Sequence, residues 1–541
     1  MGWMSNEEGL EKTKANYVPL TPLSHLRRAS VVYPDREAIV YGKDRYTYKE
    51  YYGRVTQLAS GLEKRGVQAG DVVATILPNT PAQVEAHFGV PAIGAILNTI
   101  NTRLDIKTVA YIFDHGEAKI VIVDSQFLTL AEDAKKLCES SGPEIIEVED
   151  VNSGVIKSER YLEYKELLQM GDENFNWVMP EDEWESISLN YTSGTTGRPK
   201  GVVCHHRGAY LMTMGTVVSW RLQLYPKLLI IVPLFHCNGW NHTWMMPMLG
   251  GTVFCCRDVT AKAIYDAIAD EKVTHLGGAP IVLNLIINAA DTDKKEFSHT
   301  VEVFTAGAPP APATLAAIEA IGFNVTQVYG LTETYGHVTE CVWDEKWDTE
   351  TQEIKSSIKA QQGVAFPMME EITVVDEKLN KIKNDAKDLG EIVIRGNSVM
   401  KGYFKNPEAT KEAFSGGFFH SGDIAMLHPN NYIQIADRAK DIIISGGENV
   451  SSVEVEGVLM GHPAVSLCAV VAKSDDRWGE VPFAFVELKD GEFIDEQSLI
   501  SFARSQLAGF KTPKRITFQE LPKTSTGKIQ KFELREKAKL L

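Results

Sequence analysis

One short stretch of the chain concentrates the residue types that bind phosphate groups. It reads Tyr191-Thr192-Ser193-Gly194-Thr195-Thr196-Gly197-Arg198-Pro199-Lys200-Gly201. Glycines let backbone amides turn toward an anion, Thr and Ser hydroxyls donate hydrogen bonds, and Arg198 and Lys200 add positive charge. The Walker pattern G-x-x-x-x-G-K-[ST] is absent, because Arg-Pro-Lys follows Gly197 where that pattern needs Lys-Thr. We therefore predict a polyphosphate-binding loop outside the class of P-loop NTPases.

The alternative to a binding loop is a flexible surface turn. Apolar residues stand on both sides of the stretch, with Ile187 and Leu189 before it and Val202 and Val203 after it. They predict two strands that anchor its ends, and this favours the binding loop.

Before the loop, predicted strands and helices alternate. Apolar runs predict strands at 38–41, 72–77 and 119–124, the capping-box spacing Thr47-Tyr48-Lys49-Glu50 predicts the start of a helix, and residues 82–97 are predicted to be helical. This alternation indicates a mostly parallel sheet covered by helices on both faces.

After the loop the alternation continues, and four strands end in glycine-rich or polar turns. These predicted strands are 228–233, 274–276, 301–304 and 325–328, the last followed by a turn at 329–334. Ligands of open α/β sheets bind at the carboxyl ends of the strands. We therefore expect a ligand site where these four turns meet.

From about residue 363 the predicted strands become shorter and turn residues separate them. Shorter strands predict a β-rich subdomain, and the last hundred residues predict a compact α+β unit. The charged pentapeptide Asp437-Arg438-Ala439-Lys440-Asp441 between them is a candidate hinge. We expect an α/β fold: a large N-terminal domain of stacked, mostly parallel sheets plus the β-rich subdomain, and a small mobile α+β C-terminal domain. The predicted boundaries are 1–436, 437–441 for the hinge, and 442–541.

Composition narrows the class of protein. A length of 541 residues predicts at least two domains, and 44% hydrophobic with 23% charged residues is typical of soluble globular proteins. The 55 basic and 72 acidic residues give a formal net charge of -17, which makes nucleic acid and anionic membranes poor partners. The uncharged apolar runs are shorter than the roughly 18 residues that a membrane span needs, so we expect no integral membrane span.

Cysteine usage and the chain ends suggest a compartment. The seven cysteines are scattered and form no C-x-x-C pair, which is typical of reduced thiols and not of a disulfide framework or a structural zinc site. No secretory signal is evident, and the sequence ends Lys539-Leu540-Leu541 where the peroxisomal signal is Ser-Lys-Leu. We therefore expect a cytoplasmic protein.

Four stretches together resemble the adenylate-forming superfamily of acyl-CoA synthetases, adenylation domains and luciferases. They are the loop, Tyr329-Gly330-Leu331-Thr332-Glu333, Ser421-Gly422-Asp423 with Arg438, and Thr526-Gly527-Lys528. The resemblance covers roughly Pro22 to Lys537, and Ile444-Ser445-Gly446-Gly447-Glu448-Asn449 is similar to the acyl-CoA ligases within the superfamily.

The resemblance implies a two-step reaction that uses ATP, Mg²⁺ and coenzyme A. A carboxylate attacks the α-phosphate of ATP and releases pyrophosphate, and the thiol of coenzyme A then displaces AMP from the acyl-adenylate. The residue types suit this chemistry, because cations and oriented donors must stabilise the charge that gathers at phosphorus. The implied partners are a small carboxylic acid, ATP and coenzyme A, and we expect a monomer or a homodimer.

The resemblance also implies roles for individual residues in nucleotide binding. Asp423 accepts the ribose hydroxyls with Arg438 beside it, and a purine suits the flat face of Tyr329. Thr192 and Glu333 bind Mg²⁺, with Thr332 nearby. The phosphate-binding residues are Thr192, Ser193, Gly194, Thr195, Thr196, Gly197 and Lys200. Adenine lies between the turn Gly307-Ala308-Pro309 and Tyr329, and Gln327, Gly330 and Thr332 are further cofactor-binding residues.

Lys528 is the implied catalytic residue of the first step, where it bridges the carboxylate and the α-phosphate; without the resemblance, a surface lysine is the better interpretation. Lys440 occupies the implied hinge position. There the C-terminal domain rotates between half-reactions, removing Lys528 and bringing Gly446, Gly447 and Glu448 to the pantetheine tunnel.

The sequence says least about which carboxylic acid is the substrate. By position, the pocket residues are His236, Asn238, Gly239, Trp240, Ala306, Gly330, Tyr335 and Gly336, with His236 guarding the pocket. Trp240 either closes the pocket, which favours a short or compact acid, or is a core tryptophan. The candidate acids are short- to medium-chain fatty acids, an aryl acid, or a methylthio acid such as 3-methylmercaptopropionate.

Several alternatives stay open. A stand-alone adenylating enzyme would use a carrier protein or luciferase-like oxidation in place of coenzyme A, and a catalytically inactive nucleotide-binding scaffold would support no exchange. The spacing of His236 and His242 does not suit a metal site on one helix face, and no G-x-S-x-G elbow marks a serine hydrolase. Arg257 is either a contact for a coenzyme A phosphate or a surface arginine.

Overall fold

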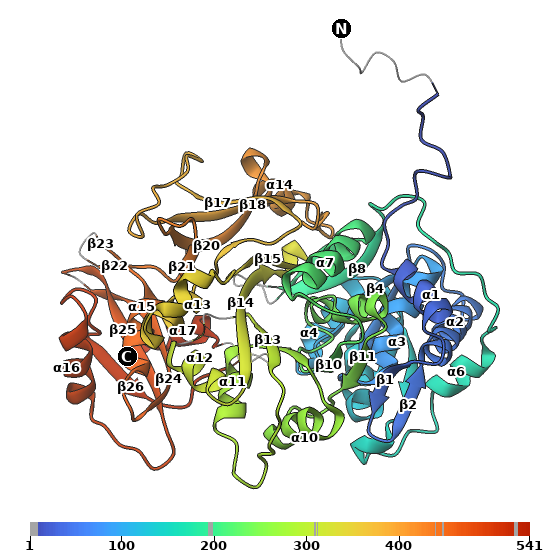
Figure 1. The fold of residues 1–541 in the computed structure, drawn as a ribbon, viewed down its shortest axis with the longest axis horizontal. Coiled ribbons are helices and arrows are strands. Elements are labelled where there is room, and N and C mark those ends of the chain that lie inside the picture. Colours follow the sequence, from blue (N-terminus) through green and yellow to red (C-terminus); the bar gives the residue numbers. More distant parts are fainter. Residues whose placement is uncertain are drawn as a thin grey trace.

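The computed structural model describes residues 9–192, 198–307, 310, 312–438, 440–445, 448–475, 477–523 and 529–541. Within this part of the chain, helices cover four sheets (Figure 1). Ten of the predicted site residues lie outside the described residues: Ser193, Gly194, Thr195, Thr196, Gly197, Ala308, Pro309, Gly446, Gly447 and Lys528.

A nine-stranded sheet contains the four strands whose ends were expected to meet. β10 (Lys227–Ile230), β12 (His275–Gly278), β13 (Val301–Thr305) and β14 (Phe323–Leu331) lie next to one another and run parallel, so their carboxyl ends share one edge. This confirms the expected arrangement. The remaining strands of this sheet are β11 (Thr252–Cys255), β1 (Glu37–Tyr41) and β2 (Asp44–Thr47) on one side, and β15 (Gly336–Glu340) and β16 (Val364–Ala365) on the other.

An eight-stranded sheet holds the phosphate-loop hairpin. β8 (Ser186–Thr192) and β9 (Lys200–His205) pair antiparallel, with Thr192 opposite Lys200. The two predicted anchoring strands are therefore confirmed, and the loop joins the two strands of a hairpin. The other strands of this sheet are β19 (Gly402–Tyr403), β4 (Ile96–Thr99), β3 (Val72–Ile76), β5 (Ala118–Asp124), β6 (Glu144–Val148) and β7 (Leu162–Glu163).

Two helix predictions had different outcomes. α2 (Tyr48–Lys64) begins at the predicted capping box, in which Thr47 and Glu50 bind each other's backbone amides. The helix predicted at 82–97 is too long, because α3 (Pro81–Gly89) ends before Pro91 and the chain then turns at Gly94, with φ of 71°, into β4. Proline lacks the amide that would continue the helix, and glycine accepts positive φ.

The other helices of the N-terminal domain cover the two large sheets in Figure 1. They are α1 (Leu23–Val32), α4 (Ile106–His115), α5 (Leu128–Leu137), α6 (Tyr164–Met170), α7 (His206–Ser219), α8 (Cys237–Trp240), α9 (His242–Met245), α10 (Ala261–Glu271), α11 (Pro280–Ile287), α12 (Pro312–Glu319) and α13 (Gln352–Lys359).

The predicted β-rich subdomain is an antiparallel four-stranded sheet. It contains β17 (Met369–Val375), β18 (Gly390–Gly396), β20 (Phe419–Leu427) and β21 (Ile433–Arg438), with α14 (Pro407–Ala413) beside it. The smaller C-terminal domain, orange to red in Figure 1, has a five-stranded sheet and three helices. Its elements are β22 (Ile443–Ser445), β23 (Glu448–Val450), α15 (Ser452–Met460), β24 (Val465–Asp475), β25 (Gly479–Leu488), α16 (Glu496–Gln506), β26 (Arg515–Phe518) and α17 (Lys531–Leu540).

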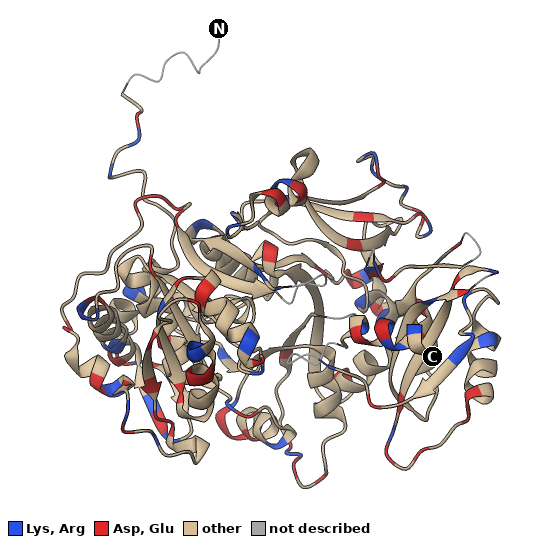
Figure 2. Cartoon of the chain, turned by 180° about the vertical axis from the view of Figure 1, so that it is seen from behind, with Lys and Arg blue, Asp and Glu red and all other residues tan. Residues whose placement is uncertain are grey.

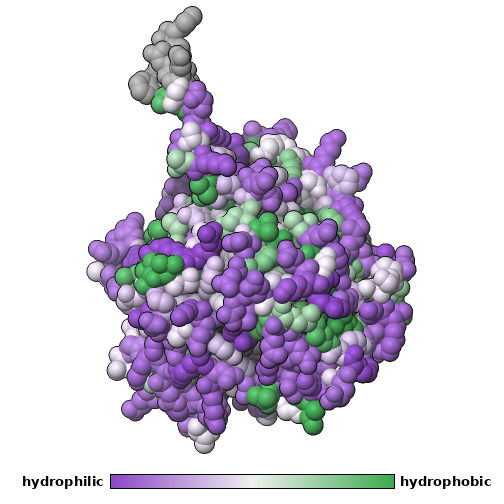
Figure 3. Space-filling model, turned by 90° about the vertical axis from the view of Figure 1, so that its right-hand side faces the viewer, coloured by the Kyte–Doolittle hydropathy of each residue, from purple (hydrophilic) through white to green (hydrophobic). Residues whose placement is uncertain are grey.

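Charges of both signs are interspersed over the chain in Figure 2, and hydrophilic side chains dominate the face shown in Figure 3. Among the described residues, no helix combines the length and apolar character that crossing a membrane requires.

Candidate active site

The base of the phosphate loop is flanked by aromatic rings. At the end of the hairpin, the Lys200 ammonium lies 4.6 Å from the centroid of the Tyr403 ring, and the Arg198 guanidinium lies 5.3 Å from that of Tyr111. A cation over an aromatic face is stabilised by the negative charge of that face. The two cations predicted to serve the loop therefore have fixed neighbours at its base.

Glu333 lies beside this base, on the short η6 helix (Thr332–Thr334) that directly follows β14. The Tyr403 hydroxyl donates to Glu333 Oε1 at 3.0 Å, and the Met400 amide donates to the Glu333 carbonyl at 2.7 Å. Burial raises the pKa of Glu333, against the lowering effects of the Tyr403 hydroxyl, Arg438 and Lys200. The predicted metal-binding carboxylate thus lies near two cations of the predicted nucleotide site.

The sequence did not indicate Tyr403. It lies in β19, a strand of two residues that pairs with β9, and its partner Glu333 is 70 positions away in the chain. No periodicity marks so short a strand, and no spacing rule links tyrosine to a carboxylate over that separation. The contact became visible only in the folded chain.

Tyr329, Asp423 and Arg438 converge from three strands. The Tyr329 hydroxyl donates to Asp423 Oδ2 at 2.6 Å, and Arg438 Nε lies 2.6 Å from Asp423 Oδ1. Asp423 of β20 and Arg438 of β21 are directly paired in the antiparallel register. Burial and the adjacent carboxylate raise the pKa of Tyr329 well above its ordinary value, so the phenol stays a hydrogen-bond donor. The structure therefore brings together three residues that the sequence assigned to one nucleoside.

The turn predicted at 329–334 is partly wrong. β14 continues through Leu331 and pairs antiparallel with β15. A Cβ on Gly330 would lie 1.9 Å from the Gly336 carbonyl oxygen, so only glycine allows this approach. Glycine at this position reflects close backbone packing within a strand and not a turn.

The chain forms a left-handed turn directly after His236, which is itself exposed. The five consecutive residues from Cys237 to Asn241 all have φ between 41° and 62°. This conformation costs a residue with a Cβ roughly 1–2 kcal/mol, less for asparagine, and Gly239 is the one glycine among the five. Contacts with the rest of the fold must therefore hold the turn.

Asn238 provides several of those contacts from inside the core. Its Oδ1 accepts hydrogen bonds from Asn190 Nδ2 at 2.8 Å and the Tyr335 hydroxyl at 3.1 Å, and its Nδ2 donates to the Thr99 hydroxyl at 3.3 Å. Asn241 Nδ2 donates to the Tyr335 carbonyl at 2.7 Å. Asn238 and Tyr335 are both fully buried. Their polar side-chain atoms are thus used within the fold.

Trp240, the fourth residue of the turn, packs against β12. A Cβ on Gly277 would lie 3.0 Å from the Trp240 ring, so the indole rests on bare backbone. The ring meets the His337 ring edge-on, with centroids 4.9 Å apart, and only 9% of Trp240 is exposed. Burial lowers the pKa of His242 and of His337 to about 3 each, so both imidazoles beside the indole are neutral at ordinary pH. The space next to β12 is filled by an apolar, uncharged group.

Of the remaining predicted residues, Ala306, Gly307 and Gln327 belong to the nine-stranded sheet or follow its strands, whereas Glu448 belongs to the C-terminal domain. Ala306 is buried after β13, and Gly307 has a positive φ of 90°. Gln327 is buried in β14 and donates to the Val328 carbonyl at 3.3 Å. Glu448 is exposed at the start of β23.

Lys440 is exposed, and acidic residues before and after it in the sequence contact the C-terminal domain. Before it, Asp437 of β21 accepts a hydrogen bond from the Ser452 amide at 2.6 Å. After it, Asp441 forms an ion pair with Arg535 of α17. Asp437 thus joins the β-rich sheet to α15, whereas the contact of Asp441 is made with the C-terminal helix.

Arg257 is not a surface arginine, and its side chain is already paired within the fold. The side chain is 6% exposed and pairs with Asp124 at 2.8 Å and Asp150 at 2.6 Å. Asp150 also accepts a hydrogen bond from the Tyr41 hydroxyl. Arg257 follows β11 of one large sheet and Asp124 ends β5 of the other, so this cluster fastens the two sheets together.

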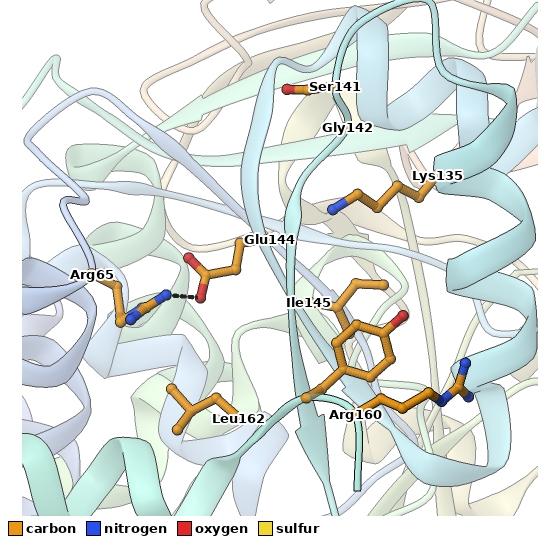
Figure 4. A pocket seen from close by; sticks show the side chains of 9 residues that line it. Arg65, Lys135, Ser141, Gly142, Glu144, Ile145, Arg160 and Leu162 are labelled. Carbon is orange, nitrogen blue, oxygen red and sulfur yellow. Dashed lines mark hydrogen bonds and ion pairs between the residues drawn. The ribbon is translucent and has the colours of Figure 1, made fainter. Parts of the chain in front are cut away.

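A surface hollow of about 440 Å³ lies away from these residues, between α5 and the last two strands of the eight-stranded sheet, β6 and β7. Figure 4 shows Arg65 paired with Glu144, and Lys135 extending toward the strand that carries Glu144 and Ile145. Its lining contains none of the predicted site residues. The candidate active site is therefore the shared edge of the nine-stranded sheet together with the hairpin base, and not this hollow.

Comparison with known proteins identifies the family of this chain. The model of the AMP-binding enzyme family matches residues 26–404, and that of the AMP-binding enzyme C-terminal domain matches residues 454–528. The chain therefore belongs to the AMP-binding enzyme family, the adenylate-forming superfamily that includes the acyl-CoA synthetases.

Relatives match over nearly their full length. The chain is 49% identical to a peroxisomal acetate/butyrate–CoA ligase of Arabidopsis thaliana, covering 98% of this chain and 97% of the relative. It is 43% identical to a peroxisomal trans-cinnamate:CoA ligase of Petunia hybrida, covering 98% and 96%. The crystal structure of an anthranilate CoA ligase in complex with anthranoyl-AMP has a TM-score of 0.86 at 25% identity, covering 98% and 99%. The predicted fold class and the predicted class of enzyme, an AMP-forming acid–thiol ligase that uses ATP and coenzyme A, are confirmed.

The prediction of a cytoplasmic protein is wrong. Both plant relatives named above are peroxisomal, as are further relatives among the acyl-activating enzymes. The absence of a Ser-Lys-Leu ending and of a secretory signal was too weak a basis for choosing a compartment.

Proposed function

We propose that this ligase activates a short carboxylic acid of the size of acetate to butyrate. The observation that carries the proposal is the position of the buried Trp240 indole, which rests on Gly277 of β12 and meets the His337 ring. We propose that this ring closes the end of the acid pocket. An acyl chain that enters from the phosphate side meets this ring after a few carbons. The relative named as an acetate/butyrate–CoA ligase, at 49% identity, supports the same size of acid.

In the first half-reaction, the residues at the sheet edge bind ATP. The Asp423 carboxylate has about four lone-pair positions, of which Tyr329 and Arg438 use two, so two remain for the ribose hydroxyls. Thr192 and Lys200 at the hairpin base stabilise the departing pyrophosphate. His236 is exposed directly before the left-handed turn, and we place it at the entrance of the acid pocket.

The attack of the carboxylate on the α-phosphate brings two anions together. We assign the neutralising cation to Lys528, on the resemblance of Thr526-Gly527-Lys528 to the family motif. The ammonium group stabilises the charge that gathers at phosphorus, and this is the main task of a protein in such a transfer.

Glu333 and Thr192 suit Mg²⁺ bound chiefly through the nucleotide. Their carboxylate and hydroxyl oxygens are hard donors, and Mg²⁺ in nucleotide sites uses one or two carboxylates together with phosphate oxygens. In the described part of the chain no group of three or more His, Cys, Asp or Glu residues could hold a metal ion by itself. When bound, the ion would neutralise phosphate charge. Glu333 and Thr192 would hold it, and Lys200 lies nearby.

For the second half-reaction we propose rotation of residues 442–541 about Lys440. The Asp441–Arg535 ion pair ties the last residue of the hinge, which follows Lys440, to the C-terminal domain, so Asp441 moves with that domain. The hydrogen bond from the Ser452 amide to Asp437 crosses the hinge, so it must break when the domain turns. Rotation removes Lys528 from the α-phosphate and brings Gly446, Gly447 and Glu448 to the incoming thiol of coenzyme A.

A panel of acids tests the proposal. We expect coenzyme A-dependent release of AMP with acetate, propionate and butyrate, and kcat/KM values at least tenfold lower with octanoate, trans-cinnamate and 3-methylmercaptopropionate. Preference for an aryl or methylthio acid would overturn the assignment of the acid. Carboxylate-dependent ATP–pyrophosphate exchange without any stimulation by coenzyme A would instead favour an adenylating enzyme with another acceptor.

We also infer a peroxisomal location from the peroxisomal relatives at 43% identity and above. Import of the full chain, labelled internally at the exposed 151–156 segment so that both ends stay free, tests this inference. A diffuse distribution in cells with labelled peroxisomes would reject it.

A further inference from the structure

We propose that Tyr403 is a positioning residue that sets the Glu333 carboxylate and the Lys200 ammonium at fixed places in the nucleotide site. The inference rests on the proposed function, since it concerns the carboxylate assigned to Mg²⁺. One side chain contacts both groups: its hydroxyl donates to Glu333 Oε1 at 3.0 Å, and its ring lies 4.6 Å from the Lys200 ammonium.

The backbone of Tyr403 is held on two sides. Tyr403 pairs with Val202 of β9, two residues beyond Lys200, so the aromatic ring and the lysine start from adjacent strands. The Tyr403 amide donates to the Thr410 hydroxyl at 2.9 Å. A Cβ on Gly402, which has φ of 150°, would lie 2.7 Å from the Thr410 methyl group, so glycine is required for this approach. The side chain therefore projects from a fixed base.

The same segment holds Glu333 by its backbone. Met400, three residues before Tyr403, donates its amide to the Glu333 carbonyl at 2.7 Å. Glu333 is thus fastened at the main chain by Met400 and at the carboxylate by Tyr403. This is a two-point attachment from one short segment to a residue of a different sheet, and it fixes the side-chain direction as well as the position of η6.

Without the hydroxyl, the carboxylate has a competing partner. Lys200 and Arg438 are both close enough to lower the pKa of Glu333. A carboxylate freed from the hydroxyl no longer has a fixed direction and can turn toward these cations, which weakens its use as a metal ligand. When only the hydroxyl is lost, the aromatic ring still lies under Lys200 and holds the phosphate-binding charge in place. The hydrogen bond from the neutral Tyr403 hydroxyl uses one lone pair of Glu333 Oε1 and leaves the other lone pairs of the carboxylate for a metal cation.

The two contacts can be removed one at a time. Tyr403→Phe deletes the hydroxyl and keeps the ring under Lys200, whereas Tyr403→Leu deletes both. Tyr161→Phe is the matched control, because the Tyr161 hydroxyl donates to Glu132 at 2.8 Å far from the site. Thermal unfolding of all three variants checks that each is folded.

The readout is metal binding as well as activity. Mn²⁺ serves as the probe, measured by electron paramagnetic resonance with ATP present, and isothermal calorimetry measures the binding of ATP without divalent metal. Loss of a partner that orients a metal ligand weakens metal binding by roughly 10–100-fold. For Tyr403→Phe we expect a Mn²⁺ affinity at least tenfold weaker and affinity for metal-free ATP within twofold of wild type. For Tyr403→Leu we expect both affinities to fall.

Unchanged Mn²⁺ affinity in a folded Tyr403→Phe variant, or equal losses in this variant and in Tyr161→Phe, would overturn the proposal. The test is separable from the proposed acid: binding of Mn²⁺ with ATP requires no carboxylate substrate. If wild type binds Mn²⁺ with ATP but activates none of the acids, the proposed function fails and the role of Tyr403 still stands.

Discussion

Replacing Trp240 with glycine should convert a short-acid ligase into one that accepts longer acids. Trp240 has φ of 56°, a conformation that glycine adopts freely and that costs alanine roughly 1–2 kcal/mol. Glycine therefore removes the ring without leaving a strained residue behind. Gly277, on which the ring rests, then lines the opened space together with His337.

The size of the effect follows from the apolar surface that the acid newly buries. Each buried methylene contributes about 0.8 kcal/mol, so the four additional methylenes of octanoate over butyrate contribute about 3 kcal/mol, or roughly 200-fold in kcat/KM. Truncation of a buried tryptophan costs about 3–5 kcal/mol of stability, so the variant must first be shown to be folded. Trp240→Phe is the graded control and should shift the preference toward hexanoate only.

The assay is coenzyme A-dependent AMP release with acetate, butyrate, hexanoate and octanoate, expressed as ratios of kcat/KM. A ratio is insensitive to the fraction of active enzyme, so partial unfolding cannot imitate the predicted change. If the octanoate-to-butyrate ratio of folded Trp240→Gly stays within threefold of wild type, the indole does not limit the pocket and is only a core residue.

Three further changes test separate parts of the molecule. Lys528→Ala should nearly abolish formation of the acyl-adenylate yet leave thioester formation from supplied acyl-AMP largely intact; equal loss of both half-reactions would contradict the assignment. Arg257→Met leaves the Asp124 and Asp150 carboxylates buried without their cation, so it should lower the free energy of unfolding by about 3–5 kcal/mol in urea titrations. The KM for coenzyme A should stay within twofold of wild type. A large rise in this KM would instead indicate that Arg257 contacts coenzyme A. Burial lowers the pKa of His242 in the folded protein to about 3, whereas its value in the unfolded chain is about 6.5. Between these two values the unfolded chain binds more protons than the folded one. The stability that His242 contributes is therefore lost as the pH falls through that window. His242→Gln should reduce the slope of the unfolding free energy against pH, measured between pH 4.5 and 6, by up to about 1.4 kcal/mol per pH unit, and an unchanged slope would contradict the neutral, buried imidazole.

The parts of the fold that the sequence predicted are those with one strong local signal. The four parallel strands that meet at the site are apolar runs bounded by turn residues, and the capping box of α2 occupies four consecutive positions. Residues 82–97 lack such a signal. An apolar run suits a buried helix and a buried strand equally, so only Pro91 and Gly94 separated α3 from β4, and their effect was underestimated.

In the predicted site, too, residues with a local sequence signal could be identified and residues without one could not. Glu333 and Asp423 lie in contiguous motifs and could be singled out from the sequence, and in the structure each accepts a hydrogen bond from a tyrosine. Tyr403 could not be found, because its importance comes from a partner 70 positions away across two sheets. The pairing of Arg257 was missed for the same reason, because its two carboxylate partners are more than 100 positions earlier in the chain.

The left-handed turn from Cys237 to Asn241 explains why the pocket was the hardest part to predict. Four of its five residues have a Cβ, and local preference opposes their conformation by several kcal/mol in total on a cost of roughly 1–2 kcal/mol each, less for the two asparagines. Hydrogen bonds that contribute about 1 kcal/mol apiece offset this, and the partners of Asn238 come from β4, from β8 and from Tyr335, the residue before β15. The turn that carries the Trp240 indole is therefore held by segments that are distant in the sequence and not by its sequence neighbours. Substitutions that loosen Asn238 should consequently alter which acids are accepted even though its side chain need never touch one.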